Sequence, residues 1–494
     1  MAFVRDVQGS RPGVRLVQIV WSKRQGVRQV EHVGTAHDEI ELVALRAKAW
    51  ERIHAGQQPL DLGLAGEGPQ HFPITASRAA RLWGALREAY RSLGFPAEVG
   101  DSAFEKLVLA RIVEPVSKLD SRRVLTELGA AAPSYSTINR CLTRCAERSW
   151  REALQRACAA HAGAAHLRLC LYDVTTLYFE TDQGDGFREP GYSKERRLEP
   201  QITVGLLTTA GGFPLLVRAF EGNCAEVRTI VPVLAEFRAA NPEADLTVVA
   251  DAGMLSEANL RALESAGYSF IVGGRIPSPP APVAAWRERH PGEEIADGQI
   301  FSSGVAPAAG RRQWSEHLQY RASRAARDLR SIEKTVAKAE RIIAGRASAR
   351  RNRFLAMEGG GYRLDDELIT SARARAGLRA YRTNLAADPA FVIDAYHQLW
   401  QIERSFRMAK SDLRARPAYH HQRERIEAHL TIVFAALAVS RWIEERTGLT
   451  IRAFLHLVRP IREVEVAIGG QTITAEDAIG LEALEALQAI HRGH

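Results

Sequence analysis

Three acidic side chains lie in sequence contexts that suit metal-assisted chemistry. The segment 167–173 predicts a strand that ends in Asp173, and the segment 246–251 predicts a buried strand that ends in Asp251. Glu403 lies in a later segment of helical periodicity. Proteins bind Mg²⁺ through oxygen ligands, and two Mg²⁺ ions can activate an attacking oxygen and stabilise a leaving oxygen. Three converging carboxylates would therefore suit phosphoryl transfer.

Each carboxylate also has a simpler interpretation. An aspartate after a strand is often only a turn former or a helix cap, so neither aspartate alone would indicate a site. Two such aspartates in matching strands, followed by a helix with a glutamate, favour the functional interpretation. The competing acidic groups are interpreted as a solvated Gly-rich loop and an exposed turn; they are Glu180, Asp182, Asp185 and residues 365–367.

The elements around the two aspartates predict an α/β fold. Strands are expected at 201–208 and 213–221, joined by the turn 210–212, with helices at about 227–240 and 256–266 and a fifth strand at 268–272. Three strands in an antiparallel meander followed by βα units are the order of a ribonuclease H-like fold. The strands of Asp173 and Asp251 are neighbours in that order, so both carboxylates should emerge at the edge where open α/β sheets bind ligands.

The remaining patterns divide the chain into six stretches. The mainly helical stretch before the catalytic domain is interpreted as DNA-binding, because short helices with tight breaks are compatible with a helix-turn-helix reader, although a plain helical bundle fits equally. The insertion subdomain begins Pro-rich and continues as a long basic helical region at 311–353. The predicted stretches are a hairpin and helix segment at 1–74, the helical domain at 75–164, the first part of the catalytic domain at 165–275, the insertion at 276–389, the second catalytic part at 390–447, and a tail at 448–494.

Composition narrows the class of protein. The chain has 494 residues, a net charge of +8 and a pI of about 9.3, and this basic balance favours nucleic acid as a partner, although a basic soluble enzyme would share it. No apolar run approaches the roughly 20 residues of a membrane helix, and no signal segment is evident, so a cytoplasmic protein without a membrane partner is expected. The five cysteines contain no CxxC pair, so neither a zinc site nor a disulfide framework is expected.

The segment around Glu403 predicts more than a metal ligand. Tyr396, Leu399, Glu403 and Lys410 recur at helical spacing and would share one face, with Glu403 and Lys410 roughly 10 Å apart along the axis. Lys410 could then hold a phosphate further along a bound strand.

Arg404 and Arg407 would widen this basic surface. The alternative is an amphipathic core helix with solvated charges. Trp400 and Phe406 are interpreted as core in either case, because aromatic residues at helical spacing are usually buried.

At this point the sequence resembles the DDE transposases of bacterial insertion sequences, in the group whose catalytic domain carries a β-rich insertion. The resemblance covers about residues 100–445. Its helix signature is spaced Tyr-x2-Arg-x3-Glu-x6-Lys and matches Tyr396, Glu403 and Lys410, whereas its arginine falls on Leu399. The other similar stretches are 110–118 (ARIVEPVSK), 172–176 (YDVTT), 191–195 (GYSKE) and 249–254 (VADAGM).

The resemblance implies a set of roles. Asp173, Asp251 and Glu403 would be the catalytic metal ligands for two Mg²⁺ ions, with Mn²⁺ able to substitute. Tyr396 and Lys410 would contact phosphates of the transposon end. Because position 399 is leucine, one phosphate contact would be either missing or supplied by a neighbour such as Arg404.

Some members of this family excise through a hairpinned end and hold a flipped base on an aromatic ring. Trp314, beside Arg311 and Arg312 in the insertion, is a candidate for such stacking, and a core position fits it equally. The three residues are therefore candidate DNA contacts.

These observations predict a bacterial DNA transposase associated with the nucleoid. It would bind terminal inverted repeats and target DNA as a homodimer and carry out cut-and-paste transposition with steeply salt-dependent binding. Two alternatives remain open: a ribonuclease H-like nuclease without strand transfer, and a catalytically inactive DNA-binding regulator derived from a transposase.

Overall fold

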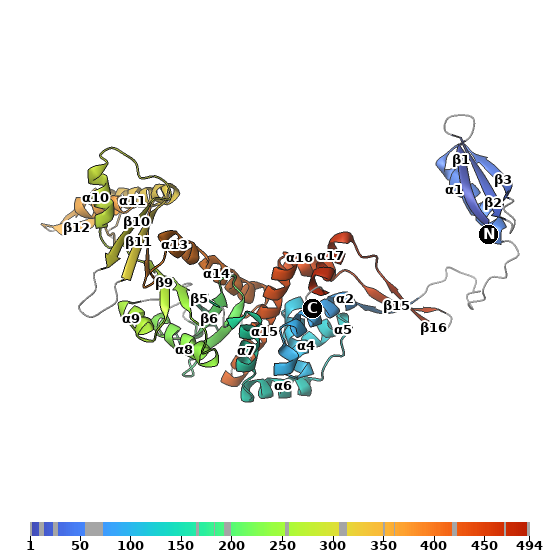
Figure 1. The fold of residues 1–494 in the computed structure, drawn as a ribbon, viewed down its shortest axis with the longest axis horizontal. Helices are drawn as coiled ribbons and strands as arrows, with labels where there is room; N and C mark the ends of the chain where they lie inside the picture. Colours follow the sequence, from blue (N-terminus) through green and yellow to red (C-terminus); the bar gives the residue numbers. More distant parts are fainter. Residues whose placement is uncertain are drawn as a thin grey trace. The chain divides into compact units, whose positions relative to one another are not determined.

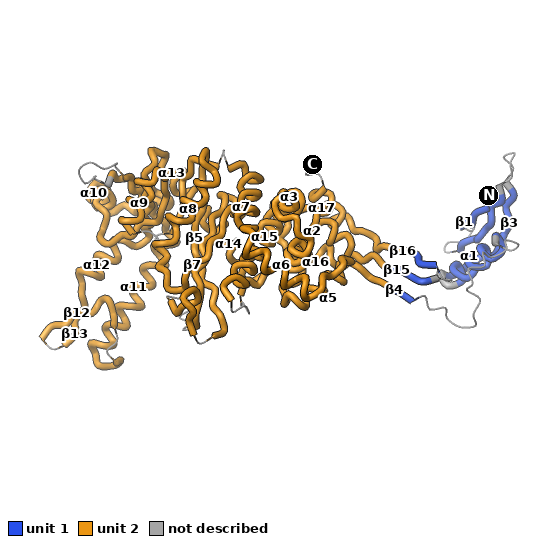
Figure 2. The backbone as a smooth tube through the Cα atoms, turned by 90° about the horizontal axis from the view of Figure 1, so that it is seen from below, with its two compact units in different colours: residues 1–75, 465–473 blue, residues 76–464, 474–494 orange. Residues whose placement is uncertain are grey.

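The structure of the protein is a computed structural model (Figure 1). It describes residues 2–8, 14–22, 28–54, 73–164, 167–181, 183–191, 199–251, 256–305, 314–348, 351–359, 361–416, 422–468 and 471–491. The chain forms two compact units, coloured separately in Figure 2: residues 1–75 with 465–473, and residues 76–464 with 474–494. All the described site residues named above belong to the second unit.

The first unit is built on a small antiparallel sheet. Its strands β1 (Ala2–Gln8), β2 (Arg15–Ser22) and β3 (Arg28–Ala36) pair in the order β1-β2-β3. Helix α1 (Glu39–His54) packs on them around Val17, Ile19 and Leu42. The predicted hairpin and helix are confirmed, and β1 is an additional strand. Strands β4 (Ile74–Arg78), β15 (Glu463–Ile468) and β16 (Gln471–Glu476) form a further sheet of order β16-β15-β4.

A long buried helix organises the helical part of the second unit. Helix α15 (Arg423–Thr447) contacts α2, α4, α6, α7 and the C-terminal helices. By length and composition α15 could cross a membrane, but 94% of its most apolar window is buried inside the protein, as in the core helix of a soluble protein. The helices around it are α2 (Ala80–Ser92), α3 (Phe95–Glu98), α4 (Ser102–Val113), α5 (Ser121–Glu127), α6 (Tyr135–Glu147), α7 (Trp150–His161), α16 (Ile451–Val458) and α17 (Leu481–His491).

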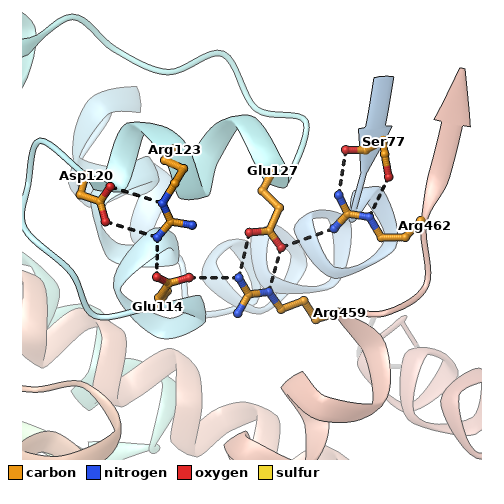
Figure 3. A network of polar contacts seen from close by, with 7 residues as sticks. All are labelled: Ser77, Glu114, Asp120, Arg123, Glu127, Arg459 and Arg462. Carbon is orange, nitrogen blue, oxygen red and sulfur yellow. Dashed lines mark hydrogen bonds and ion pairs between the residues drawn. The ribbon is translucent and has the colours of Figure 1, made fainter. Parts of the chain in front are cut away.

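A polar network joins the end of α16 to α5 (Figure 3). Arg459 donates to Glu127 at 2.8 and 2.9 Å and to Glu114 at 3.1 Å. Arg462 also reaches Glu127, at 3.4 Å. These side chains are partly exposed, so each ion pair alone contributes little to stability. Because the pairs share carboxylates, they form one continuous network between α16 and α5. The residues drawn are Ser77, Glu114, Asp120, Arg123, Glu127, Arg459 and Arg462.

The part of the chain that contains Asp173 and Asp251 forms an eight-stranded mixed sheet. Its order is β10-β11-β14-β9-β8-β5-β6-β7. The contiguous set β7-β6-β5-β8-β9 has an antiparallel meander and two parallel pairs, β5 with β8 and β8 with β9, which confirms the predicted strand order and is consistent with a ribonuclease H-like fold. The strands are β5 (Leu169–Tyr178), β6 (Gln201–Thr209), β7 (Pro214–Glu221), β8 (Thr247–Ala250), β9 (Ser269–Gly274), β10 (Ile300–Val305), β11 (Trp314–Tyr320) and β14 (Leu378–Thr383).

The helices of this part flank the sheet. Helix α8 (Ile230–Ala240), preceded by the short 3-10 turn η2 (Glu226–Arg228), contacts β6 and β7, and α9 (Glu257–Ser265) contacts β9. Ser256 caps α9, because its hydroxyl accepts from the amide of Asn259 at 3.3 Å. Helix α13 (Pro389–His397) contacts β14, β9 and β8, and helix α14 (Leu399–Arg407) contacts β5.

The segment between β9 and α13 extends the same sheet. Strand β14 pairs antiparallel with β9, and β11 pairs with β14. The predicted helix over 311–353 is wrong for 314–320, where cross-strand pairing on both sides of β11 overrides the local composition, and the helix α11 covers only Ala322–Ile343. The segment also contains α10 (Ala281–Arg289), α12 (Asp366–Ala374), and the hairpin of β12 (Leu355–Glu358) and β13 (Gly361–Leu364).

Candidate active site

The register of the parallel strands places the two aspartates side by side. Tyr172 of β5 pairs with Ala250, the last residue of β8, so Asp173 and Asp251 occupy the next level of two adjacent strands. Asp251 follows its strand as predicted. Asp173 does not: β5 continues to Tyr178, and Asp173 pairs with Leu206 of β6. The β-branched run after Asp173 favours strand, and β6 offers it a partner along its whole length.

Glu403 comes to the aspartates from helix α14. A pocket of about 240 Å³ is lined by Asp173, Asp251 and Glu403 together with Arg379, Tyr396, His397, Leu399, Trp400 and Ile402. The three predicted carboxylates therefore share one pocket, contributed by β5, the end of β8 and α14.

The donor types in this pocket suit a hard divalent cation, which is held in proteins by carboxylate oxygens and water. Within the described ranges, however, no three His, Cys, Asp or Glu side chains lie close enough together to form a metal site. The carboxylates line the pocket without meeting at one point.

A hydrogen-bonded chain leads from Asp251 into the protein. The hydroxyl of Tyr396 donates to Asp251 Oδ1 at 2.7 Å, and Arg379 donates to the same hydroxyl oxygen at 3.0 Å. The Arg379 guanidinium also lies 4.6 Å from the centre of the Tyr396 ring. Burial raises the pKa of Tyr396, and its bond to Asp251 acts in the same direction, so the hydroxyl stays protonated and remains a donor.

Tyr396 contacts one of the predicted metal ligands. Its side chain is 2% exposed, its hydroxyl donates to Asp251, and it lines the carboxylate pocket. The expected single helix is broken: α13 ends at His397 and α14 begins at Leu399, on either side of Gln398. Tyr396 and Glu403 therefore belong to two helices, yet both line the same pocket with Leu399.

The other predicted contacts are dispersed. Lys410 lies in η4 (Met408–Asp412), a π-helical segment, and lines a different cavity from Glu403. Arg404 donates to Glu444 at 2.8 Å, so its guanidinium is engaged within the protein, whereas Arg407 is exposed. Arg311 and Arg312 lie outside the described residues.

Trp314 takes the core position that was one of its two alternatives, whereas Trp400 does not lie in the core. Trp314 is buried against Phe270 and donates to Glu264 at 3.2 Å, so its ring is not available to stack on a base. Trp400 is 52% exposed and lines the carboxylate pocket, which contradicts its interpretation as core, while Phe406 is buried as predicted. Trp400 stands three residues before Glu403, and this i, i+3 spacing could have placed it beside the glutamate.

Helix α14 is fixed from behind by the turn between β6 and β7. The hydroxyl of Ser405 donates to the carbonyl of Gly212 at 2.7 Å. Arg441 of α15 reaches both the carbonyl of Gly211 and the amide oxygen of Gln401, the latter at 3.3 Å. Gly212 has φ of 84°, and a Cβ there would lie 2.9 Å from the Gln401 carbonyl, so only glycine allows this close approach.

Comparisons with known proteins bear on this site. A model of the family described as "Transposase DDE domain" matches residues 165–439, more than half of the chain and the stretch that contains all three carboxylates. Among solved structures, the cryo-EM structure of a piggyBac transposase synaptic complex with hairpin DNA is similar with a TM-score of 0.37 and 9% sequence identity, over 76% of this chain and 70% of that chain. No curated protein matches the sequence.

Proposed function

We propose that this chain, which belongs to the family of DDE transposase domains, cuts DNA at terminal inverted repeats and joins the cut ends to target DNA. The observation that carries the proposal is the single pocket lined by Asp173, Asp251 and Glu403. In such a reaction water attacks the phosphorus and the 3′-oxygen leaves as a hydroxyl. This 3′-hydroxyl then attacks a phosphorus of the target strand, and the target strand's own 3′-oxygen leaves as a hydroxyl.

The three carboxylates would hold two Mg²⁺ ions, with Mn²⁺ able to substitute. When bound, such ions lower the pKa of water and neutralise charge on the attacked phosphate. The chain's own contribution is to fix the ligands. Tyr396 donates to Asp251 Oδ1 and so fixes the orientation of that carboxylate in the pocket.

Arg379 would make the phosphate contact that the arginine of the helix signature makes in the family that this chain resembles. Position 399 is leucine, and Arg404 is paired with Glu444, whereas Arg379 lines the carboxylate pocket. Arg379 also lines an adjoining cavity of about 460 Å³ that contains Arg324, Arg353 and Arg375. We infer that these arginines bind those phosphates of the DNA strand that lie away from the reacting bond. We also infer that Trp400 stacks on a base beside the reacting bond.

Tyr396→Phe tests the positioning of Asp251. The change removes one hydroxyl and keeps the ring that contacts Tyr381 and Arg379. We expect cleavage to slow by roughly 10- to 100-fold, as for other groups that orient a metal ligand, with DNA affinity unchanged. Single-turnover cleavage at several Mg²⁺ concentrations measures this. Tyr362→Phe, at an exposed position on β13, is the matched control. A rate equal to that of wild type would remove Tyr396 from the site.

Arg379→Met tests the phosphate contact. Loss of a charge-assisted hydrogen bond to phosphate is worth about 1.5–3 kcal/mol, which is roughly a 10- to 100-fold rise in the DNA concentration needed for half-maximal cleavage. Arg379→Lys should recover part of the loss, because lysine restores the charge without the planar fork. Arg373→Met on α12, an exposed arginine outside both cavities, is the control. Equal behaviour of the variants at 379 and 373 would contradict the assignment.

The whole proposal is tested with labelled DNA that carries the terminal inverted repeats, an unlabelled target plasmid and Mg²⁺. Metal-dependent cuts at the repeat end followed by joining to the plasmid support it. Cuts without joining would indicate a nuclease of the same fold, and binding without cuts would indicate a regulator. Because both ends must be paired before they are joined, the active species is proposed to be a homodimer on DNA, and its mass in the complex checks this.

A further inference from the structure

A second cavity of the helical part gathers cationic side chains from separated segments of the chain. It has a volume of about 830 Å³ and lies among α4, the loop that follows it, α6, η4 and α15. Its cationic and histidine residues are Arg111, Lys118, Lys410, Arg414, Arg416 and His429. The carboxylate that lines it, Asp120, is ion-paired with Arg123 at 3.3 Å.

Two of these cations are placed without an acidic partner. Arg111 is 7% exposed and contacts His429 Nδ1 at 3.4 Å, and Lys118 Nζ lies 3.0 Å from the same nitrogen. Neither side chain forms an ion pair with a carboxylate in the described part of the chain. His429 Nε2 lies 3.2 Å from the carbonyl of Ala415, so Nε2 carries the proton and Nδ1 accepts. A histidine in this state supplies no charge to offset the two cations.

This arrangement costs stability unless an anion is bound. Burial lowers the pKa of Lys118 well below its usual value, and the neighbouring Arg111 acts in the same direction. Burial likewise lowers the pKa of Arg111 to about 10. Desolvated cations without a counter-charge destabilise a folded protein, so their presence here indicates a purpose other than stability.

The backbone beside the cavity is also irregular. Lys410 lies in the π-helical segment η4, and such segments are frequent at functional sites. Arg414 has φ of 41°, a left-handed conformation that costs free energy in a residue with a side chain. Its neighbours Leu413 and Ala415 are buried and bonded back to η4, at 2.9 and 2.8 Å, which holds the strained residue at the cavity.

We propose that this cavity binds phosphate groups of the DNA strand, at a site apart from the carboxylate pocket. The inference rests on the proposed function for its source of phosphate, because η4 continues α14 and so joins the cavity to the helix of Glu403. The open side chains of Tyr135 and Leu119 at the cavity, which are 54% and 53% exposed, offer apolar contact to sugar and base. A phosphodiester strand presents charge and apolar surface together in this way.

Two substitutions separate binding from stability. Lys118→Met removes a desolvated charge and nearly keeps the side-chain volume. Arg414→Gly removes a cation and suits the left-handed backbone. If these residues served the fold, both variants would melt below wild type. A binding role predicts melting temperatures equal to or above wild type together with weaker DNA binding. Lys106→Met, on the same helix α4 and outside the cavity, is the matched control.

The test uses the full chain without metal, so that no DNA is cut. Thermal melting with tripolyphosphate should show a rise of several degrees for wild type and Lys106→Met, and none for the two cavity variants. Titration of a labelled oligonucleotide at several salt concentrations should show about tenfold weaker binding for each cavity variant, with a salt slope reduced by about one. Salt slopes equal to that of wild type in both variants would overturn the proposal. So would a result in which stabilisation by tripolyphosphate depends on Lys118 but DNA binding does not. That result would assign the cavity to a small phosphate ligand.

The outcome is separable from the proposed function. If the wild-type protein never cuts DNA but both cavity variants bind DNA more weakly, the phosphate site is supported and the transposase activity is contradicted. If the wild-type protein cuts and joins DNA but both cavity variants bind DNA as tightly as wild type, the transposase activity is supported and the phosphate site is contradicted.

Discussion

Asp173→Asn is expected to abolish DNA cleavage and joining, by roughly a thousandfold or more, because a neutral amide is a poor ligand for the hard divalent ions that such reactions use. The fold should be retained. Asp173 Oδ1 accepts a hydrogen bond from the amide of Val174 at 2.8 Å, and the asparagine carbonyl can accept the same bond. DNA affinity should be unchanged or tighter, since a negative charge facing the substrate is lost.

The measurement is single-turnover cleavage of inverted-repeat DNA in Mg²⁺ and in Mn²⁺, beside a binding titration. Glu180→Gln, at an exposed position beyond the end of β5, is the control and should cut like wild type. Cleavage that survives in Asp173→Asn would mean that the active site has been placed wrongly. Loss of binding and cleavage together would instead point to a damaged fold.

Glu444→Ala is expected to lower the free energy of unfolding by about 3–5 kcal/mol, because it leaves a buried arginine without its counter-charge. Glu444 is 8% exposed and accepts from Arg441 at 3.0 Å, from Arg404 at 2.8 Å and from the amide of Ile451 at 3.0 Å. Burial lowers the pKa of Arg441, and Glu444 is the main group that opposes this effect. Removing Glu444 therefore exposes the full cost of burying Arg441.

Urea unfolding followed by circular dichroism measures the change. Glu445→Ala, the next residue on α15 and exposed, is a control of the same chemistry and should shift stability little. An equal loss in both variants would contradict the assignment of the loss to the buried Arg441 pair. Because Arg404 and Gln401 flank Glu403 and both reach this pair, Glu444→Ala should also slow cleavage more than its effect on stability explains.

The sequence predicted the parts of the site that depend on local pattern. Alternating and buried apolar runs gave the strand order, and Asp251 follows β8 where the run of apolar residues ends. The turn 210–212 joins β6 and β7 as expected from its glycines. In each case the residues that form the element also determine where it ends.

Sequence reasoning failed where distant pairing decides. Strand β5 runs past Asp173 because β6 supplies a partner, and residues 314–320 form a strand because β10 and β14 flank them. The sequence around Gln398 does not predict a helix break, because it contains neither proline nor glycine. Arg379 could not be found at all, because it reaches the pocket only when β14 joins β9 across the whole intervening segment.

Helix α15 has a consequence for how the protein is made. It forms the centre against which α2, α4, α6 and α7 pack, yet it follows them by most of the chain's length. A ribosome adds about 5–20 residues per second, so the early helices wait on the order of tens of seconds for their core to be translated. During that time their apolar faces are uncovered and should engage chaperones. Nascent chains halted before residue 423 are therefore expected to bind holdase chaperones and to be degraded, whereas chains released after residue 447 are not.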